Sequence, residues 1–351
     1  MENVLKMMNE AKKKHIRIIK ACSGDVYYGE IPHELILRSN IMNREIVLIL
    51  DLNILNIMKD CLDYPELMHL YPNLQNFIRF LNSSYNVVLA PGFALGEAGE
   101  DYAMKIYYAY ELFIRYYCPN YTDAHNGINK FTFKEHNSKF SQLDKGLQLL
   151  ISLFYASSLC MLICKLQYGN NKFIAEGYII GFLMIKLECA CGILSTFVIE
   201  VAKFVFFKND SNEWAHSDCL TSIRKNFSKS GSDILHVALN IAFDLFLIFI
   251  SSAGDKRFLD GVAQDLWLVT ADNGIAEFSK FLNYTDDKGS FEPRRDDFMK
   301  NNKYWQTCDN LHLGFRQFFP QQIKANELDY DKLFEKIKEL ETELQGLKHD
   351  K

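Results

Sequence analysis

The apolar run VLILDLNIL, residues 47–55, breaks at an aspartate and continues two residues later with an asparagine. The segment EIVLILD (45–51) is short, β-branched and leucine-rich, which is typical of a buried strand. A carboxylate at the end of a buried segment costs free energy unless a partner compensates it. Asp51 is therefore either a turn or helix-capping residue, or part of a functional site.

Two other segments have the same character as this first strand. YNVVLAP (85–91) ends at a proline and leads into a helix predicted over 93–117, and LWLVTAD (266–272) again ends in an aspartate. Helical segments separate the three predicted strands, and residues 1–24 are expected to be helical as well. This alternation of strands and helices predicts an α/β fold with a mostly parallel sheet.

The composition is that of a globular protein of 351 residues, with 48% hydrophobic and 24% charged residues. That length suits two average domains, or one domain with a large insertion. A formal net charge of -5 gives no overall attraction to nucleic acid, so a nucleic-acid site would have to be local. The nine cysteines are scattered without a Cys-x-x-Cys pair, which indicates reduced thiols in a cytoplasmic protein and no structural zinc.

Three stretches, 147–164, 178–207 and 234–254, are apolar enough to raise the question of a membrane. The second and third carry several charged or strongly polar side chains, which are costly in lipid. They are Lys186, Glu188, Glu200, Lys203, His236, Asn240 and Asp244. We therefore expect buried helices of a large domain and no membrane, with a membrane-associated protein spanning at 147–207 as the alternative.

Acidic residues follow each of the three predicted strands. Asp51 and Asp272 end two of them, and Glu97 begins the helix after the third, where Glu100 and Asp101 are expected to share its face. The carboxyl ends of parallel strands meet at one edge of a sheet, where ligands bind. Carboxylates brought together repel one another unless a cation is present, and Mg²⁺ or Mn²⁺ is the cation that hard oxygen ligands prefer. Such a metal activates water for attack on a phosphodiester.

Four motifs occur in the order found in PIN-domain ribonucleases: LDLNIL (50–55), APGFALGE (90–97), SDILHVAL (232–239) and LVTADNGI (268–275). The chain thus resembles that family. The resemblance implies that the metal-binding and catalytic acids are Asp51, Glu97, Asp233 and Asp272, and that Asn53 and Thr270 support them. Asp255 is the alternative third acid, because its spacing to Thr270 is closer to the family pattern.

The resemblance also implies a fold and an activity. The expected fold is a PIN-like three-layer α/β/α core with a large α-helical insertion, and the expected activity is that of a Mg²⁺- or Mn²⁺-dependent endoribonuclease. RNA is the expected substrate, with DNA as the alternative. Many family members are toxin ribonucleases of toxin–antitoxin pairs and others process RNA, so a toxin or defence role with an inhibitor or partner protein is one expectation. A catalytically inactive PIN-like interaction module is the alternative function.

On this interpretation the chain has five parts. They are an N-terminal helical segment (1–45), the first part of the core (46–117), the helical insertion (118–230), the second part of the core (231–325) and a C-terminal amphipathic helix (326–351). The C-terminal helix carries a heptad stripe that either packs on its own domain or forms a homo-oligomer contact. The stripe consists of Leu333, Ile337, Leu340, Leu344 and Leu347.

Several basic residues lie near the predicted acids in the sequence. Each of them either binds phosphate or belongs to a solvated face. They are Arg224, Lys225, Lys229, Lys256, Arg257, Arg294 and Arg295.

Overall fold

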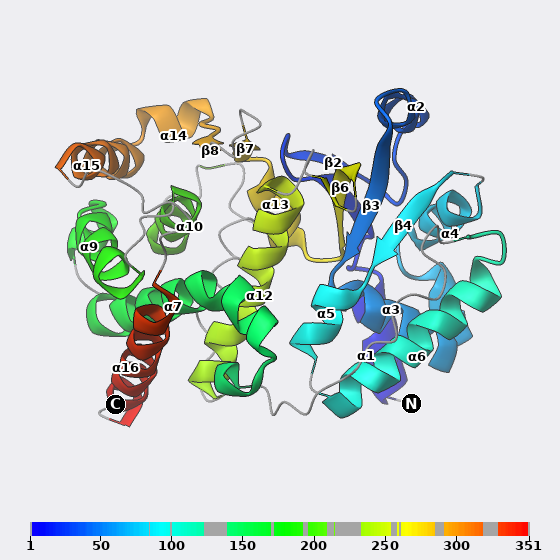
Figure 1. Ribbon diagram of the computed structural model, residues 1–351, viewed down its shortest axis with the longest axis horizontal. Coiled ribbons are helices and arrows are strands. Elements are labelled where there is room, and N and C mark those ends of the chain that lie inside the picture. Colours follow the sequence, from blue (N-terminus) through cyan, green and yellow to red (C-terminus); the bar gives the residue numbers. More distant parts are fainter. Residues whose placement is uncertain are drawn as a thin grey trace. The chain divides into compact units, whose positions relative to one another are not determined.

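The computed structural model divides the chain into two compact units (Figure 1). Unit 1 comprises residues 1–138 and 247–292, and unit 2 comprises residues 139–246 and 293–351. The structure describes residues 2–83, 85–98, 100–122, 139–169, 172–191, 196–208, 214, 233–253, 258–259, 261–284, 291–318 and 329–349.

Unit 1 is built on a mixed sheet whose strand order is β2-β1-β6-β3-β4. At its centre β3 (Arg44–Leu50) is parallel to both β4 (Val87–Ala90) and β6 (Val262–Thr270). β1 (Arg17–Lys20) is antiparallel to β6 and to β2 (Asp25–Tyr27). The short β5 (Phe258–Leu259) pairs with the start of β6, and β7 (Leu282–Tyr284) pairs separately with β8 (Phe291–Pro293).

The prediction of an α/β fold is confirmed, and the three predicted strands correspond to β3, β4 and β6. The prediction of helix over 1–24, and of an entirely helical segment 1–45, is wrong in part. α1 (Glu2–Ala11) and α2 (His33–Ile41) are helical, but β1 and β2 lie between them. Ile18 and Ile19 of β1 are buried because the antiparallel pairing with β6 places them in the sheet, a distant partner that local sequence does not reveal.

Helices cover the sheet of unit 1, and α3 (Leu52–Asp63) packs against α6 (Glu100–Tyr117) in this layer (Figure 1). Alternate residues of β3, such as Ile46 and Leu48, join one buried cluster with side chains of α3, α4 (Leu74–Asn82) and α6. The intervening Val47 and Ile49 are also buried, so β3 is covered on both faces, as parallel strands usually are. The remaining helical elements of unit 1 are Pro65–His69, α5 (Gly92–Glu97) and α13 (Asn273–Ser279).

Unit 2 is helical in the part that the structure describes. Its helices include α7 (Lys145–Tyr168), α8 (Lys172–Ala175), α9 (Ile179–Cys191) and α10 (Thr196–Phe206). α14 (Asp297–Asn301), α15 (Lys303–Phe318) and α16 (Tyr330–His349) come from the end of the chain. α12 (Ile234–Ala253) begins in unit 2 and ends in unit 1. The helical unit therefore contains the C-terminal segment as well as most of the predicted insertion.

The heptad stripe of α16 packs inside unit 2. Leu333, Ile337, Leu340 and Leu344 are buried, and α16 lies against α7 and α9. A homo-oligomer remains a prediction, but it would need a surface other than this stripe. α7 and α12 are long and apolar enough to cross a membrane by length and composition, and most residues in the apolar stretch of each helix are buried within the protein. Core helices of soluble proteins pass the same test.

Candidate functional site

Asp51 lies between β3 and α3 and is 1% exposed. Its Oδ2 accepts a hydrogen bond of 2.6 Å from the Thr270 hydroxyl and one of 3.0 Å from Asn53 Nδ2. Its Oδ1 accepts a longer one, 3.4 Å, from the Asn53 backbone N–H at the start of α3. Asp51 is therefore a helix cap, as one interpretation of the sequence predicted, and also the centre of a polar cluster that joins two strands.

Asp272 occupies the equivalent place after β6, the parallel neighbour of β3. Its Oδ1 caps α13 by accepting hydrogen bonds from the backbone N–H groups of Gly274 (2.6 Å) and Ile275 (3.2 Å). Its own N–H donates to the Thr270 hydroxyl oxygen at 2.9 Å. The Thr270 hydroxyl thus connects the two aspartates, because it accepts from the backbone of Asp272 and donates to the side chain of Asp51.

The electrostatics of Asp51 disfavour its charge. Burial raises the pKa of the Asp51 carboxyl, hydrogen bonds from Thr270 and Asn53 lower it in part, and the nearby negative charge of Asp272 raises it further. All three hydrogen-bond donors to Asp51 are neutral. Within the described ranges, no lysine or arginine forms an ion pair with Asp51. A bound cation would therefore relieve a cost that the surrounding residues do not offset.

Glu97 lies at the same edge of the sheet as the two aspartates. It ends α5, which follows β4 and packs against β3 and α3; the residue is half-buried and its Oε2 is buried. The predicted continuous helix over 93–117 is interrupted at Ala98, which has an extended backbone. Glu97 and the pair Glu100 and Asp101 therefore belong to different helices, and the shared helical face predicted for them is wrong.

Among the residues that the structure describes, no three His, Cys, Asp or Glu side chains form a metal-binding group. The structure brings together Asp51 and Asp272 with Asn53 and Thr270, and it places Glu97 at the same sheet edge.

Asp233 belongs to unit 2, where it precedes α12 and is exposed. Its Oδ1 accepts a hydrogen bond of 3.1 Å from the Leu235 backbone N–H, as a helix cap does. Burial, Glu341 and the negative charge of Asp233 together raise the pKa of Tyr155 in α7. His236, one turn later, lies 3.3 Å from Asn240 and is half-buried. The role of Asp233 as the third acid stays a prediction. Asp255 and five of the predicted basic residues lie outside the described residues: Arg224, Lys225, Lys229, Lys256 and Arg257.

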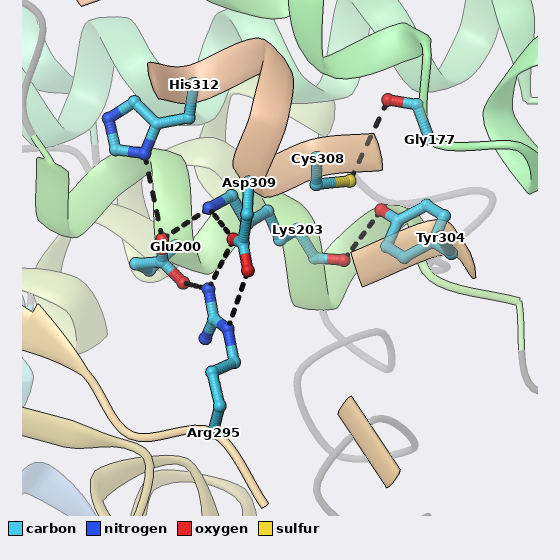
Figure 2. A network of polar contacts seen from close by, with 8 residues as sticks. All are labelled: Gly177, Glu200, Lys203, Arg295, Tyr304, Cys308, Asp309 and His312. Carbon is cyan, nitrogen blue, oxygen red and sulfur yellow. Dashed lines mark hydrogen bonds and ion pairs between the residues drawn. The ribbon is translucent and has the colours of Figure 1, made fainter. Parts of the chain in front are cut away.

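Unit 2 contains a second cluster of charges, which the sequence did not reveal (Figure 2). Lys203 of α10 donates to Glu200 Oε1 at 2.6 Å and to Asp309 Oδ1 of α15 at 2.8 Å. Arg295 donates through Nη2 to Glu200 Oε2 at 2.6 Å and to Asp309 Oδ1 at 2.9 Å. His312 Nδ1 lies 4.0 Å from Glu200 Oε1.

The ionic network of Glu200, Lys203, Arg295 and Asp309 balances two acids with two bases. Glu200 and Lys203 are each 1% exposed, and the Arg295 guanidinium also lies 5.2 Å from the centre of the Trp305 ring. Because these four charges cancel, the network needs no further ion. Arg295, predicted either to bind phosphate or to lie on a solvated face, is instead paired within the protein.

Arg17 is a residue at the candidate site that sequence reasoning missed, because the segment containing it was expected to be helical. In the β1–β6 pairing Arg17 lies opposite Thr270. Its signal in the sequence is the alternation of isoleucines around it, Ile16 and Ile18, which has the period of a strand but is too short to identify one.

Comparisons of the chain with protein-family models, with curated proteins and with solved structures found no match. The likeness to PIN-domain ribonucleases therefore rests on the four motifs and on the acid pair described above.

Proposed function

We propose that the chain is a divalent-metal-dependent nuclease that hydrolyses phosphodiester bonds of RNA, with a PIN-like core in unit 1. The observation that carries this proposal is the fully buried Asp51, which has neutral hydrogen-bond donors and a second carboxylate, Asp272, nearby. A protein maintains such an arrangement at a cost in stability, and a bound cation turns that cost into binding energy.

Two carboxylates are a sufficient protein contribution for Mg²⁺. This ion usually keeps several waters and binds through one or two carboxylates together with the phosphates of a substrate. Asp51 and Asp272 supply the pair, and Glu97 at the same sheet edge would contribute directly or through a water. Mn²⁺ accepts the same oxygen ligands. The third acid that the resemblance implies, Asp233 or Asp255, stays a prediction.

When bound, the metal would lower the pKa of a coordinated water and neutralise charge on the scissile phosphate. The surrounding residues hold the ligands in place. Thr270 and Asn53 both donate to Asp51 Oδ2, which fixes the orientation of the carboxylate and leaves Oδ1 with a single long hydrogen bond. Hydrogen-bond donors that hold a metal ligand in this way typically contribute about 10- to 100-fold to metal affinity or activity.

The direct test is an RNA-cleavage assay with labelled single-stranded RNA in Mg²⁺ or Mn²⁺. Asp51→Asn and Asp272→Asn should each reduce the cleavage rate by more than about 100-fold, because several kcal/mol of metal-derived stabilisation are lost. Asp63→Asn is the matched control, since Asp63 is a half-exposed acid of α3 that pairs with Lys59. Cleavage by both site variants at the wild-type rate would overturn the proposal. A DNA strand of the same sequence, assayed in parallel, decides between RNA and DNA.

A second candidate, a PIN-like interaction module without catalysis, is favoured by a different observation. Exposed apolar side chains gather around α8 and α9 in unit 2, and two pairs of them are in ring contact. They are Tyr168, Phe173, Tyr178, Phe182 and Ile185. Exposed apolar groups of this kind often mark protein-binding surfaces. Calorimetry separates the two candidates, because a module without catalysis predicts no Mn²⁺ binding by the wild-type protein.

A further inference from the structure

A row of polar side chains crosses the sheet of unit 1 at the edge where Asp51 lies. Thr270 of β6 donates to Asp51, and Arg17 of β1 is the residue opposite Thr270. Directly opposed residues of antiparallel strands project from the same face, with Cβ atoms about 5 Å apart. Tyr28 follows β2, and the Arg17 guanidinium carbon lies 5.9 Å from the centre of its ring. The row therefore runs through Asp51, Thr270, Arg17 and Tyr28.

Arg17 has the features of an anion-binding group. The residue is 9% exposed, and its Nη1 donates to the backbone carbonyl of His15 at 3.1 Å. In the part of the chain that the structure describes, no carboxylate forms an ion pair with Arg17. A buried guanidinium beside a neutral carbonyl and an aromatic ring retains donors for a planar bidentate partner such as phosphate. Arg295 differs from Arg17 in this respect, because it pairs with two acids.

Tyr28 has the features of a stacking group. It is 53% exposed, and its ring contacts Arg17 and makes a T-shaped contact with the His15 ring, whose centre is 6.4 Å away. An aromatic ring that is held in place yet exposed can stack on a base of any sequence. The strand spacing of about 4.8 Å puts Tyr28 roughly 14 Å from Asp51, three strands across the sheet.

We propose that Arg17 and Tyr28 position single-stranded RNA beside the acid pair, Arg17 by binding a backbone phosphate and Tyr28 by stacking on a base. This inference rests on the proposed nuclease function. Both residues would contact the RNA, and the RNA strand would cross the edge of the sheet over β3, β6, β1 and β2. Basic and aromatic groups adjoining one another are the usual components of a single-strand site.

The test measures binding of fluorescein-labelled oligouridylate by anisotropy in the Asp51→Asn background, which prevents cleavage. Arg17→Gln should weaken binding and reduce the slope of log affinity against log salt by about 1, as loss of one phosphate contact does. Tyr28→Ala should weaken binding about fivefold or more, and Tyr28→Phe should restore it because the ring remains. The matched controls on α6, Arg115→Gln and Tyr116→Ala, change an exposed arginine and an exposed tyrosine outside the row.

The outcomes separate the inference from the function on which it rests. If Asp51 is required for cleavage but Arg17→Gln and Tyr28→Ala bind like the controls, the nuclease proposal stands and this inference is wrong. If Asp51→Asn and the wild type do not differ in the cleavage assay and the protein does not bind the oligonucleotide, both are wrong. Should Arg17→Gln fail to fold, the exposed Tyr28 decides alone, through the difference between its Ala and Phe variants.

Discussion

Two buried acidic side chains, Asp51 of unit 1 and Glu200 of unit 2, are compensated by the fold in opposite ways. In unit 1, Asp51 is held by the neutral donors of Thr270 and Asn53. In unit 2, Glu200 accepts from both Lys203 and Arg295, so its charge is matched inside the fold. A matched network is a structural element, whereas a buried carboxylate whose charge the fold leaves uncompensated points to a ligand that compensates it.

The pKa directions follow the same division. The pKa of Asp51 is raised by burial and by Asp272. Burial would also raise the pKa of Asp309, but hydrogen bonds from Arg295 and Lys203 and their positive charges outweigh it, so this pKa is lowered. The two regions therefore respond differently to substitution, to metal and to pH, and each response tests the comparison.

The largest effect on stability is expected in the ionic network. Lys203→Met leaves Glu200 buried with one base fewer, and breaking a buried pair in this way costs about 3–5 kcal/mol of unfolding free energy. Urea unfolding followed by circular dichroism measures it. Lys300→Met, which removes an exposed ion pair with Asp297, is the control and should cost less than about 1 kcal/mol. A cost for Lys203→Met as small as that of the control would remove the structural role of the network.

Metal should stabilise unit 1 by a somewhat smaller amount. At a Mn²⁺ concentration of 100 times the Kd, binding to the folded state alone adds about 2.7 kcal/mol. Thermal unfolding with and without Mn²⁺ shows the shift, and the double variant Asp51→Asn/Asp272→Asn should abolish it. The Lys203→Met variant should keep the Mn²⁺-dependent rise in unfolding temperature, because the network binds no metal. An equal rise in the wild type and the double variant would contradict the comparison.

Without metal, Asp51→Asn should make the protein more stable, by on the order of 1 kcal/mol. The substitution removes a charge that burial and Asp272 disfavour, and the amide oxygen can still accept from Thr270. The test measures the midpoint of urea unfolding in EDTA for this variant and for the wild type. Loss of stability in Asp51→Asn would mean that the ionised carboxylate is already compensated within the fold.

The smallest effect is the pH dependence of these differences. An acid whose pKa is raised by folding costs stability only above its unfolded pKa of about 3.9, so the advantage of Asp51→Asn should shrink as the pH falls from 7 toward 4. The pKa of Asp309 shifts in the opposite direction. Because it is lowered in the folded protein, ionised Asp309 contributes stability above the unfolded pKa, and this contribution is lost as the pH falls through the lowered pKa. Unfolding measured along a pH series for Asp51→Asn and Asp309→Asn checks both; an advantage of Asp51→Asn that does not change with pH would exclude the raised pKa as its cause.

The strands and the acid pair could be predicted because their signals are local. A buried apolar run that ends in aspartate identified β3 and β6, and the Asp-x-Asn and Thr-x-Asp motifs identified the residues that surround Asp51. Glu97 was placed at the correct sheet edge for the same reason, since it follows β4.

The remainder depends on partners far apart in the sequence. β1 is a strand because β6 pairs with it, so Arg17 could not be assigned to the sheet edge from its neighbours alone. The ionic network joins Glu200 and Lys203, which are three residues apart, to Arg295 and Asp309 from a separate segment. Asp233 illustrates the reverse case, because its local motif was recognised and the structure assigns it to unit 2.

The most direct test of the central claim is a crystal structure of the wild-type protein soaked in Mn²⁺, with the metal located by its anomalous signal. The account predicts a Mn²⁺ ion coordinated by Asp51 and Asp272, with no ion at Glu200 or Asp309. The same map would show whether Glu97, Asp233 or Asp255 completes the coordination. A crystal in which Mn²⁺ binds elsewhere, while Asp51 keeps only its hydrogen bonds from Thr270 and Asn53, would contradict the account and reduce the acid pair to two helix caps.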